Sequence, residues 1–360
     1  MSELQQRLAE ISEKQRAPLY VDGYEILSSA SIGVSLFPDH GVCYDVLRTN
    51  ADSAMYRCKA STKGGVKFFD PSVQHMAAER TRLEQRLRLA IRDKRICCAY
   101  QPKVDFRTDT VVGVEALLRW RDEEGFIHPP SDFVELAIEL GLMDDVTKLV
   151  LAEVAQSIDQ INAAFGERAT ISVNIAAKQA ENARLMRSVL EQIEATGQAK
   201  RFMLELTEEA FFAKSQFQSR ILPMIRDAGA RVSIDDFGVG YSSLSALADV
   251  TADEIKVDRS FVTDLPRRPR SQSVLKAIES LGRSLDMSVV VEGVETFEEL
   301  AYLQAATRIN VAQGYYFCKP LLLDELGAAK VSDARDLAPP RSAGQGRADA
   351  QGRDSIVRRA

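Results

Sequence analysis

From Ile96 onward the sequence alternates between short apolar runs and longer segments with helical periodicity. Repeated alternation of strand and helix predicts a parallel sheet covered by helices. About eight strands in about 230 residues fit a (β/α)₈ barrel better than an open doubly wound sheet, because such barrels are typically near 250 residues long. The predicted strands are 97–104, 111–118, 170–175, 202–206, 232–234, 254–257, 288–291 and 311–317.

The first two predicted strands are separated only by residues 105–110. A connection this short cannot hold a crossover helix, so these two strands are expected to pair antiparallel. The predicted fold is therefore a TIM-like (β/α)₈ barrel that contains one antiparallel strand.

Residues 232–243 combine a β-branched run, two adjacent carboxylates and a glycine-rich loop. Asp235 and Asp236 would repel each other at a strand end unless cations neutralised them, which favours a site for hard cations. Ordinary turn chemistry of Asp and Gly explains this stretch equally well when it is considered alone. The choice depends on whether other strands deliver matching groups.

Nearly all of the remaining predicted strands also carry a polar or ionisable side chain at or near their ends. In a barrel the carboxyl ends of the strands form the face where chemistry takes place. Each residue alone has an ordinary explanation, such as an exposed strand end, a helix cap or a solvated lysine. Their joint placement is harder to explain in that way, and the candidates are Glu115, Asn174, Glu205, Asp235, Asp236, Lys256, Glu292 and Gln313.

The candidate ligands are oxygen donors, without His or Cys, and this favours Mg²⁺ or Mn²⁺ over zinc. Several carboxylates beside one lysine suggest two neighbouring cations that activate a water molecule and hold phosphate oxygens in line. This chemistry predicts metal-assisted phosphoester hydrolysis, although enolase-type and aldolase-type barrels also combine carboxylates, lysine and Mg²⁺.

The composition limits which binding partners and which cellular compartment are expected. The net charge of −6 and the pI near 5.4 give no reason to expect DNA as a partner. The five cysteines are odd in number and lack Cys-x-x-Cys spacing, which favours a reducing cytoplasm and no zinc site. The polar N-terminus and the lack of a long apolar run predict a cytoplasmic chain without a membrane segment.

Several motifs now support a specific resemblance. Glu115-Ala116-Leu117-Leu118-Arg119-Trp120 resembles the signature of the EAL family of cyclic di-GMP phosphodiesterases. Further motifs resemble the rest of that family in the same order, over about residues 96–326. They are Gln101-Pro102, Ser172-Val173-Asn174-Ile175, Glu205-Leu206-Thr207-Glu208, Asp235-Asp236-Phe237-Gly238, Ile255-Lys256-Val257-Asp258, Val291-Glu292-Gly293-Val294-Glu295 and Gln313-Gly314-Tyr315-Tyr316-Phe317.

The resemblance implies a role for each candidate. Lys256 would position or activate the attacking water, with Glu292 as a base or a further metal contact. Gln313 would order the hydrated site, and Gln101 and Arg119 would contact cyclic di-GMP. Two cations would be held by Glu115, Asn174, Glu205, Asp235 and Asp236. The loop of Phe237, Gly238, Val239, Gly240, Tyr241, Ser242 and Ser243, anchored by Glu208, would couple the metal site to homodimerisation.

The chain departs from the family pattern at three places. Val239 stands where the family usually has Thr, so a hydroxyl group is lost while the β-branched shape is kept. Altered coupling of the loop is expected rather than abolished chemistry. Ile138 replaces an acid, and Arg308-Ile309-Asn310 replaces Gly-Cys-Asp; neither change touches a proposed ligand.

The segments outside the barrel receive separate expectations. Residues 1–70 resemble the closing half of a GGDEF (diguanylate cyclase) domain, with a helix at 4–14, a strand at 25–36 and a helix at 46–59. The cyclase Gly-Gly-Asp/Glu-Glu-Phe motif is absent from the sequence, so cyclase activity is not expected. Residues 71–95 are predicted to form a helical linker, 96–330 the barrel and 331–360 a disordered tail. Half a domain would expose a sheet edge and apolar surface, so we expect either a fragment of a longer protein with an upstream sensory module, or a segment that packs on a partner.

The resulting hypothesis is metal-dependent hydrolysis of cyclic di-GMP to linear pGpG in bacterial signalling. The alternative is a weak or inactive cyclic di-GMP receptor or adapter that acts through protein partners. Retention of the acids and of Lys256 favours the enzyme.

Overall fold

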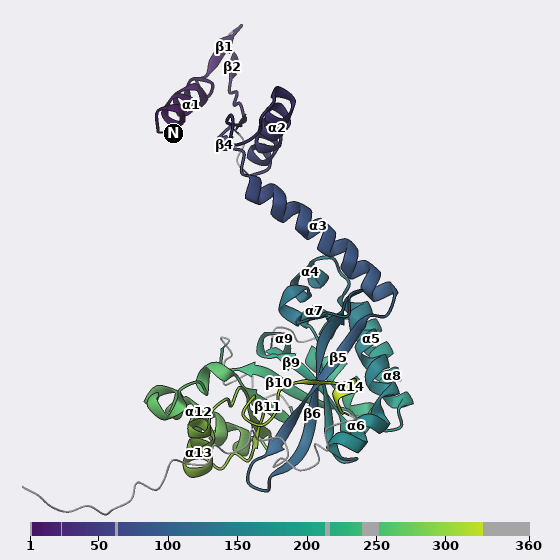
Figure 1. The fold of residues 1–360 in the computed structure, drawn as a ribbon. Helices are drawn as coiled ribbons and strands as arrows, with labels where there is room; N and C mark the ends of the chain where they lie inside the picture. Colours follow the sequence, from purple (N-terminus) through teal and green to yellow (C-terminus); the bar gives the residue numbers. More distant parts are fainter. Residues whose placement is uncertain (1, 23, 62–63, 213–216, 240–251, 327–360) are drawn as a thin grey trace, which may run out of the picture. The chain divides into compact units, whose positions relative to one another are not determined.

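The computed structural model of the chain describes residues 2–22, 24–61, 64–212, 217–239 and 252–326 (Figure 1). Two compact units meet in the sequence between Arg86 and Leu87. Helix α3 (Pro71–Arg92) spans this boundary and lies within the predicted helical linker at 71–95. Among the described helices, none combines the length and the apolar character needed to cross a membrane.

The second unit is a closed barrel (Figure 1). Going round the ring, the strands follow the order β5, β13, β12, β11, β10, β9, β8 and β6, and pairing of β6 with β5 closes it. This confirms the predicted TIM-like fold. The bounds are β5 Ile96–Asp105, β6 Thr110–Arg121, β8 Thr170–Asn174, β9 Phe202–Thr207, β10 Arg231–Phe237, β11 Glu254–Val257, β12 Ser288–Val291 and β13 Val311–Ala312.

Strand β5 is antiparallel to both of its neighbours in the ring, β6 and β13, whereas the other ring pairings are parallel. The expected antiparallel strand is therefore confirmed. It follows from the short connection between β5 and β6, which allows only a tight reversal. Two short strands add to the outside of the ring, β7 (Ile127–His128) on β6 and β14 (Leu321–Leu322) on β5.

Helices cover the outside of the barrel because each presents an apolar stripe to the sheet. In α8, for example, Leu185, Met186, Val189, Leu190 and Ile193 are buried. Helices α5 and α6 are separated at Ser157. The bounds are α4 Val134–Glu139, α5 Met143–Gln156, α6 Ile158–Phe165, α7 Ala177–Ala180, α8 Ala183–Ala195, α9 Glu208–Phe212, α10 Leu222–Asp227, α12 Pro269–Ser284, α13 Phe297–Ala306 and α14 Leu323–Leu326.

The prediction of a strand over 311–317 is wrong in extent, because β13 ends at Ala312. Beyond this point the backbone turns, and the N–H groups of Phe317 and Cys318 both donate to the carbonyl of Gly314. A Cβ at Gly314 would collide with the backbone of Val294, so the chain passes too close to that loop for any larger residue. The early end of β13 places Gln313 directly after the strand.

The first unit contains α1 (Ser2–Lys14), β1 (Leu19–Val21), β2 (Tyr24–Ile26), β3 (Ile32–Val34), α2 (Tyr44–Ser61) and β4 (Val66–Phe68). Strands β1 and β2 form an antiparallel hairpin, and β3 and β4 are parallel. The single strand predicted over 25–36 is wrong, because residues 27–31 leave the extended pairing and separate β2 from β3.

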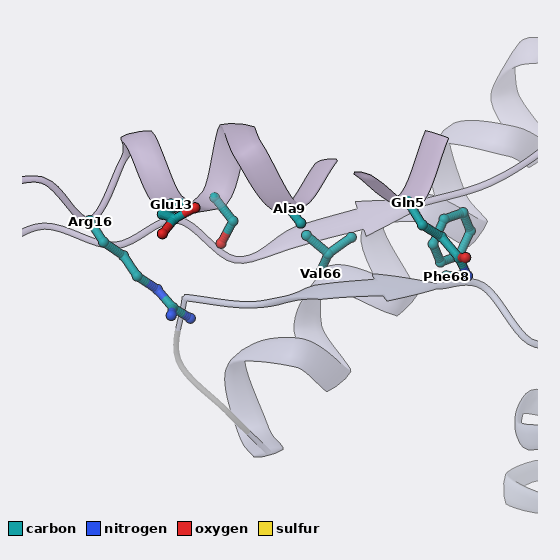
Figure 2. A pocket seen from close by; sticks show the side chains of 7 residues that line it. Gln5, Ala9, Glu13, Arg16, Val66 and Phe68 are labelled. Atoms are coloured by element: carbon teal, nitrogen blue, oxygen red, sulfur yellow. The ribbon is translucent and has the colours of Figure 1, made fainter. Parts of the chain in front are cut away.

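A cavity of about 550 Å³ lies between α1 and β4 in this unit (Figure 2). Ser12 and Arg16 of the α1 region donate hydrogen bonds to the carbonyl of Gly64, at 3.0 and 2.5 Å, and so tie the helix to the start of β4. Val66 and Phe68 line the cavity from the strand. Several large apolar side chains in this unit are exposed, among them Leu19, Tyr20, Tyr24, Leu27 and Phe37.

Candidate active site

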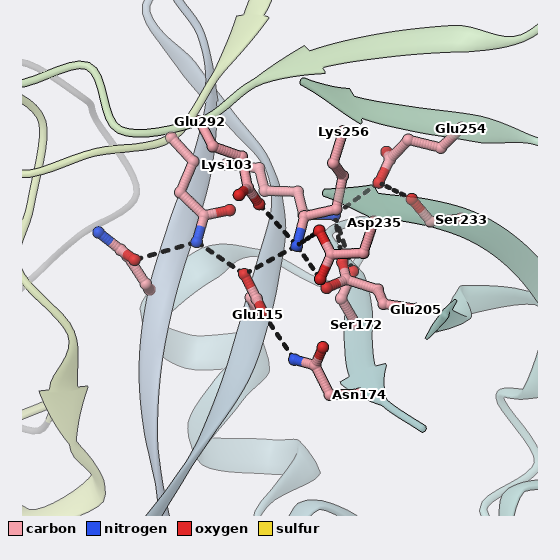
Figure 3. A network of polar contacts seen from close by, with 12 residues as sticks. Lys103, Glu115, Ser172, Asn174, Glu205, Ser233, Asp235, Glu254, Lys256 and Glu292 are labelled. Atoms are coloured by element: carbon pink, nitrogen blue, oxygen red, sulfur yellow. Dashed lines mark hydrogen bonds and ion pairs between the residues drawn. The ribbon is translucent and has the colours of Figure 1, made fainter. Parts of the chain in front are cut away.

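The ring of strands brings the polar residues at its carboxyl ends into one cluster (Figure 3). Asn174 ends β8, Glu292 directly follows β12, and Gln313 directly follows β13. Glu115 lies within β6, opposite Gln101 in the antiparallel register with β5. Lys256 and Glu205 lie near the ends of β11 and β9. These residues come from widely separated parts of the sequence and meet because the barrel closes.

Lys256 is the centre of the cluster and is 1% exposed. Its Nζ lies 2.6 Å from Glu205 Oε2, 2.6 Å from Glu292 Oε1, 3.0 Å from Asp235 Oδ1 and 3.4 Å from Glu115 Oε2. One ammonium group is thus shared by four carboxylates. The acids outnumber the cation, so the site has a strong surplus of negative charge.

Glu115 is held by two side-chain amides. Asn174 Nδ2 donates to Glu115 Oε1 at 2.7 Å, and Gln313 Nε2 donates to Oε2 at 2.8 Å. Gln313 Nε2 also donates to Gln101 Oε1 at 3.0 Å, and Gln101 Nε2 donates to the carbonyl of Cys318. This chain of hydrogen bonds fixes the Glu115 carboxylate between β8 and β13.

Asp235 and Asp236 both contribute to the cluster although they are consecutive in one strand. Side chains of consecutive strand residues normally point to opposite faces. Here the pairing of β10 with β11 shifts between Ile234 and Phe237, and Asp236 has a φ of 52°. This bulge turns both carboxylates to the same side, and ligand atoms of Asp235, Asp236 and Glu292 lie within 4.8 Å of one another.

Burial and mutual repulsion govern the ionisation of the acids. Burial raises the pKa values of Glu115, Asp235 and Asp236, and neighbouring carboxylates add to the effect. Burial also raises the pKa of Glu292 to about 8, although Lys256 acts in the opposite direction. Glu205 differs: burial would raise its pKa, but Lys103 and Lys256 lower it far below the usual range. Glu205 is therefore the permanently ionised acid of the site.

The cluster opens into a cavity of about 220 Å³. Sequence reasoning missed Arg259, which approaches because Gly293 has a φ of 68° and no side chain; a Cβ there would collide with Arg259 Cβ. Arg119, predicted to contact the ligand, does not line this cavity, and its guanidinium donates to the carbonyl of Leu118. The lining residues are Gln101, Glu115, Leu117, Asp235, Lys256, Arg259, Glu292, Gly293, Glu295, Gln313, Gly314 and Tyr315.

The start of the loop after β10 is tied to a neighbouring helix. The buried carboxylate of Glu208, the first residue of α9, accepts a hydrogen bond from the N–H of Gly238 at 2.8 Å. Phe237 is buried and Val239 is 62% exposed. The other predicted loop residues, Gly240, Tyr241, Ser242 and Ser243, lie outside the described residues, as does the predicted tail 331–360.

Sequence reasoning also missed a second buried lysine, Lys103, beneath the cluster (Figure 3). Its Nζ contacts Ser172 Oγ, Glu205 Oε1 and Glu254 Oε1 at 2.8, 2.8 and 2.7 Å. The available signal was the position of a lysine inside the apolar run 97–104, since lysine is almost never fully buried without a partner. Its partners could not be deduced, because they come from three other strands.

Two of the three departures from the family pattern lie away from this cavity. Ile138 is exposed on α4, and Arg308 is exposed before β13. Arg308 instead lines a groove of about 590 Å³ with Arg231 and Arg283. Neither residue is among those that line the cavity at the acidic cluster.

A (β/α)₈ barrel with an acidic cluster able to hold a metal ion at the ends of its strands defines the general class of this chain. Residues 84–320 match the EAL domain, and the chain belongs to this family.

Two cyclic di-GMP phosphodiesterases are similar in sequence to this chain over most of its length. Cyclic di-GMP phosphodiesterase NbdA of Pseudomonas aeruginosa is 35% identical over 338 residues, which is 94% of this chain and 43% of NbdA. Cyclic di-GMP phosphodiesterase PdeR of Escherichia coli is 33% identical over 322 residues, which is 89% of this chain and 48% of PdeR. The chain thus spans less than half the length of these relatives.

A solved structure, the c-di-GMP complex of PaMucR phosphodiesterase, matches with a TM-score of 0.64 and 32% identity. The match covers 68% of this chain and 99% of that one. The barrel is therefore similar to a phosphodiesterase whose structure was solved as a c-di-GMP complex.

Proposed function

We propose that this chain hydrolyses cyclic di-GMP to the linear dinucleotide pGpG in a reaction that depends on divalent cations. The observation that carries the proposal is the convergence of five carboxylates, two amides and Lys256 at the carboxyl end of an EAL-family barrel. The names of NbdA and PdeR and the nucleotide complex of PaMucR support the choice of substrate.

We propose that the cluster holds two divalent cations, Mg²⁺ or Mn²⁺. Hard cations of this kind take carboxylate and amide oxygens, and the cluster offers these donors. Gln313 Oε1 is buried and has no hydrogen-bond partner among the described residues, so it retains free lone pairs beside Glu115. The proposed ligands are Glu115, Asn174, Glu205, Asp235, Asp236 and Glu292. When bound, the cations would neutralise phosphate charge and make a water molecule more nucleophilic.

The side chains would then divide the remaining work. Lys256 can orient the attacking water and offset negative charge on the phosphate, because its ammonium lies at the centre of the cluster. Glu292 can accept the proton of that water when it is ionised, which its pKa of about 8 places at slightly alkaline pH. Gln101 and Gln313 border the same cavity, and their amide N–H groups can donate hydrogen bonds to the oxygens of a bound phosphodiester. Arg119 remains a proposed nucleotide contact.

Hydrolysis of cyclic di-GMP by the purified chain tests the function. Linear pGpG is expected with Mg²⁺ or Mn²⁺, and the product should disappear with EDTA and return when the metal is restored. Chromatographic separation of the nucleotides gives the rate. Tight nucleotide binding without turnover under these conditions would favour the alternative function, a cyclic di-GMP receptor. The exposed Val239 would then be the first residue to replace with the Thr that is usual in the family.

The affinity for metal is expected to fall as the pH is lowered below about 8. Glu292 has a pKa of about 8 in the folded protein, against an ordinary value of 4.5. Protonation of Glu292 therefore stabilises the metal-free fold. This contribution is fully present below pH 4.5 and is lost as the pH rises through 8. Metal requires the ionised carboxylate, so its affinity should weaken by up to about tenfold per pH unit below 8. Calorimetric Mn²⁺ titrations at pH 6.5 and 8.5 measure this, and Glu292→Gln should flatten the slope. Equal wild-type affinities at both pH values would contradict the assignment.

We further propose that residues 1–70 are the closing half of a GGDEF-like domain joined to the barrel by a helical linker at 71–95. The β3–α2–β4 arrangement is a parallel pair with a crossover helix, as expected for part of a larger α/β sheet. The NbdA match takes in most of the residues before Glu84, and MucR of P. aeruginosa, named a bifunctional diguanylate cyclase/cyclic di-GMP phosphodiesterase, aligns with 87% of the chain. Homodimerisation, on the strength of the family resemblance, and a cytoplasmic location, on the strength of the composition, complete the proposal.

A further inference from the structure

A second buried lysine lies directly below the acidic cluster. Lys103 projects from β5, is 1% exposed, and contacts Ser172 of β8, Glu205 of β9 and Glu254 of β11 (Figure 3). Its three neighbours match the three hydrogens of an ammonium group. The side chain therefore has one well-defined position, fixed by three strands on the other side of the barrel interior.

Glu205 is consequently held at both of its oxygens by different lysines. Oε1 accepts from Lys103 at 2.8 Å, and Oε2 accepts from Lys256 at 2.6 Å. Lys256 also contacts Glu115, Asp235 and Glu292, so Oε2 is the oxygen that faces the acidic cluster. Lys103 occupies the opposite oxygen and sets the rotation of the carboxylate.

Glu254 completes this arrangement without changing the charge of the site. Its Oε1 accepts from Lys103 at 2.7 Å and from Ser233 Oγ at 3.1 Å. The Lys103–Glu254 pair is neutral overall, yet burying two ions is costly, and apolar residues of similar size often stabilise a protein at least as well. A buried pair that contacts a proposed metal ligand is thus better explained by positioning than by stability.

We propose that Lys103 is a positioning residue that holds Glu205 so that only Oε2 faces the metal site, with Glu254 keeping Lys103 in place. This inference rests on the proposed metal-dependent function. If Lys103 and Glu254 served stability alone, removing both charges together would leave metal binding intact. If Lys103 positions Glu205, the defect in metal binding persists in the double variant.

The test compares Lys103→Met, Glu254→Gln and the double variant Lys103→Met/Glu254→Gln. Calorimetry without nucleotide gives the Mn²⁺ affinity, thermal unfolding gives the integrity of the fold, and kcat and KM for cyclic di-GMP are measured at saturating Mn²⁺. The double variant should unfold within a few degrees of the wild type but bind Mn²⁺ at least tenfold more weakly, with a lower kcat and a nearly unchanged KM. Glu254→Gln alone should weaken Mn²⁺ binding less than threefold, since its amide oxygen can still accept from Lys103.

A surface substitution of the same kind provides the control. Lys148→Met removes a half-buried lysine of α5 that forms an ion pair with Asp145 at 3.6 Å, and it should leave Mn²⁺ affinity unchanged. If the double variant does not fold, Lys103→Gln removes the ammonium while keeping a polar side chain, and its Mn²⁺ affinity must also fall.

Wild-type Mn²⁺ affinity in the double variant, or in Lys103→Gln, would overturn the proposal. Because metal binding is measured without nucleotide, a wild type that binds Mn²⁺ but does not hydrolyse cyclic di-GMP would contradict only the proposed function. A wild type that does not bind Mn²⁺ would overturn both.

Discussion

Replacement of Glu115 with glutamine is expected to reduce kcat/KM for cyclic di-GMP by about 10³-fold or more, equivalent to about 4 kcal/mol of transition-state stabilisation. Glu115 is the proposed ligand around which Asn174 and Gln313 are arranged, at 2.7 and 2.8 Å. Glutamine keeps the size of the side chain but removes the negative charge. One of its two oxygens also becomes an NH2 group, which would face the amide donor of either Asn174 or Gln313, so the donor–acceptor pattern fails at that contact.

The fold should survive this change. Charge removal relieves part of the repulsion within the cluster, which is what raises the pKa of Glu115 beyond the effect of burial. Glu153→Gln provides a matched control, because Glu153 is a partly buried acid of the same barrel that accepts the N–H of Cys98 at 2.9 Å. Steady-state rates of pGpG formation and thermal unfolding of both variants decide the outcome. Glu115→Gln with at least a tenth of wild-type activity would remove Glu115 from the metal site.

Much of this site could be predicted from the sequence because parallel strands end on the same face of a barrel. Asn174, Glu292 and Gln313 each come at the end of an apolar run, so the fold alone brings them together. The antiparallel β5 was predictable for a similar local reason, the short connection to β6.

Other features depend on contacts that no local pattern records. The bulge at Asp236 is set by the register of β10 against β11, and the early end of β13 by the approach of Gly314 to Val294. Lys103 and Glu254 stand inside strands, where their charge contradicts the apolar pattern until their mutual contact is known. The N-terminal strands were misjudged because residues 27–31, which pair with no described strand, separate two short strands that were predicted as one.

Lys256→Met is expected to lower kcat by about 10²- to 10⁴-fold and to make folding strongly dependent on divalent cations. In the metal-free protein Lys256 is the counter-charge of Glu115, Glu205, Asp235 and Glu292. These carboxylates raise the pKa of Lys256 well above its ordinary value even though burial opposes them, so the ammonium stays charged at all working pH values. Removing it leaves buried carboxylates without compensation, at a cost of about 3–5 kcal/mol in unfolding free energy.

The loss of unfolding free energy in Lys256→Met should grow with pH and should be reversed by added metal. A simple packing defect would show neither dependence. At acidic pH the carboxylates escape repulsion by taking up protons, whereas a rising pH favours their ionisation and added cations are then needed to replace the missing ammonium. Urea unfolding at pH 6 and 8, with EDTA or with Mg²⁺, measures how the unfolding free energy depends on pH and on metal. Lys276→Met on the exposed face of α12 serves as the control. Because bound Mg²⁺ can restore the charge balance but cannot orient the attacking water as Lys256 does, stability should recover while activity stays low. Recovery of both would reduce Lys256 to a counter-ion, and recovery of neither would mean that the acidic cluster does not bind the cation.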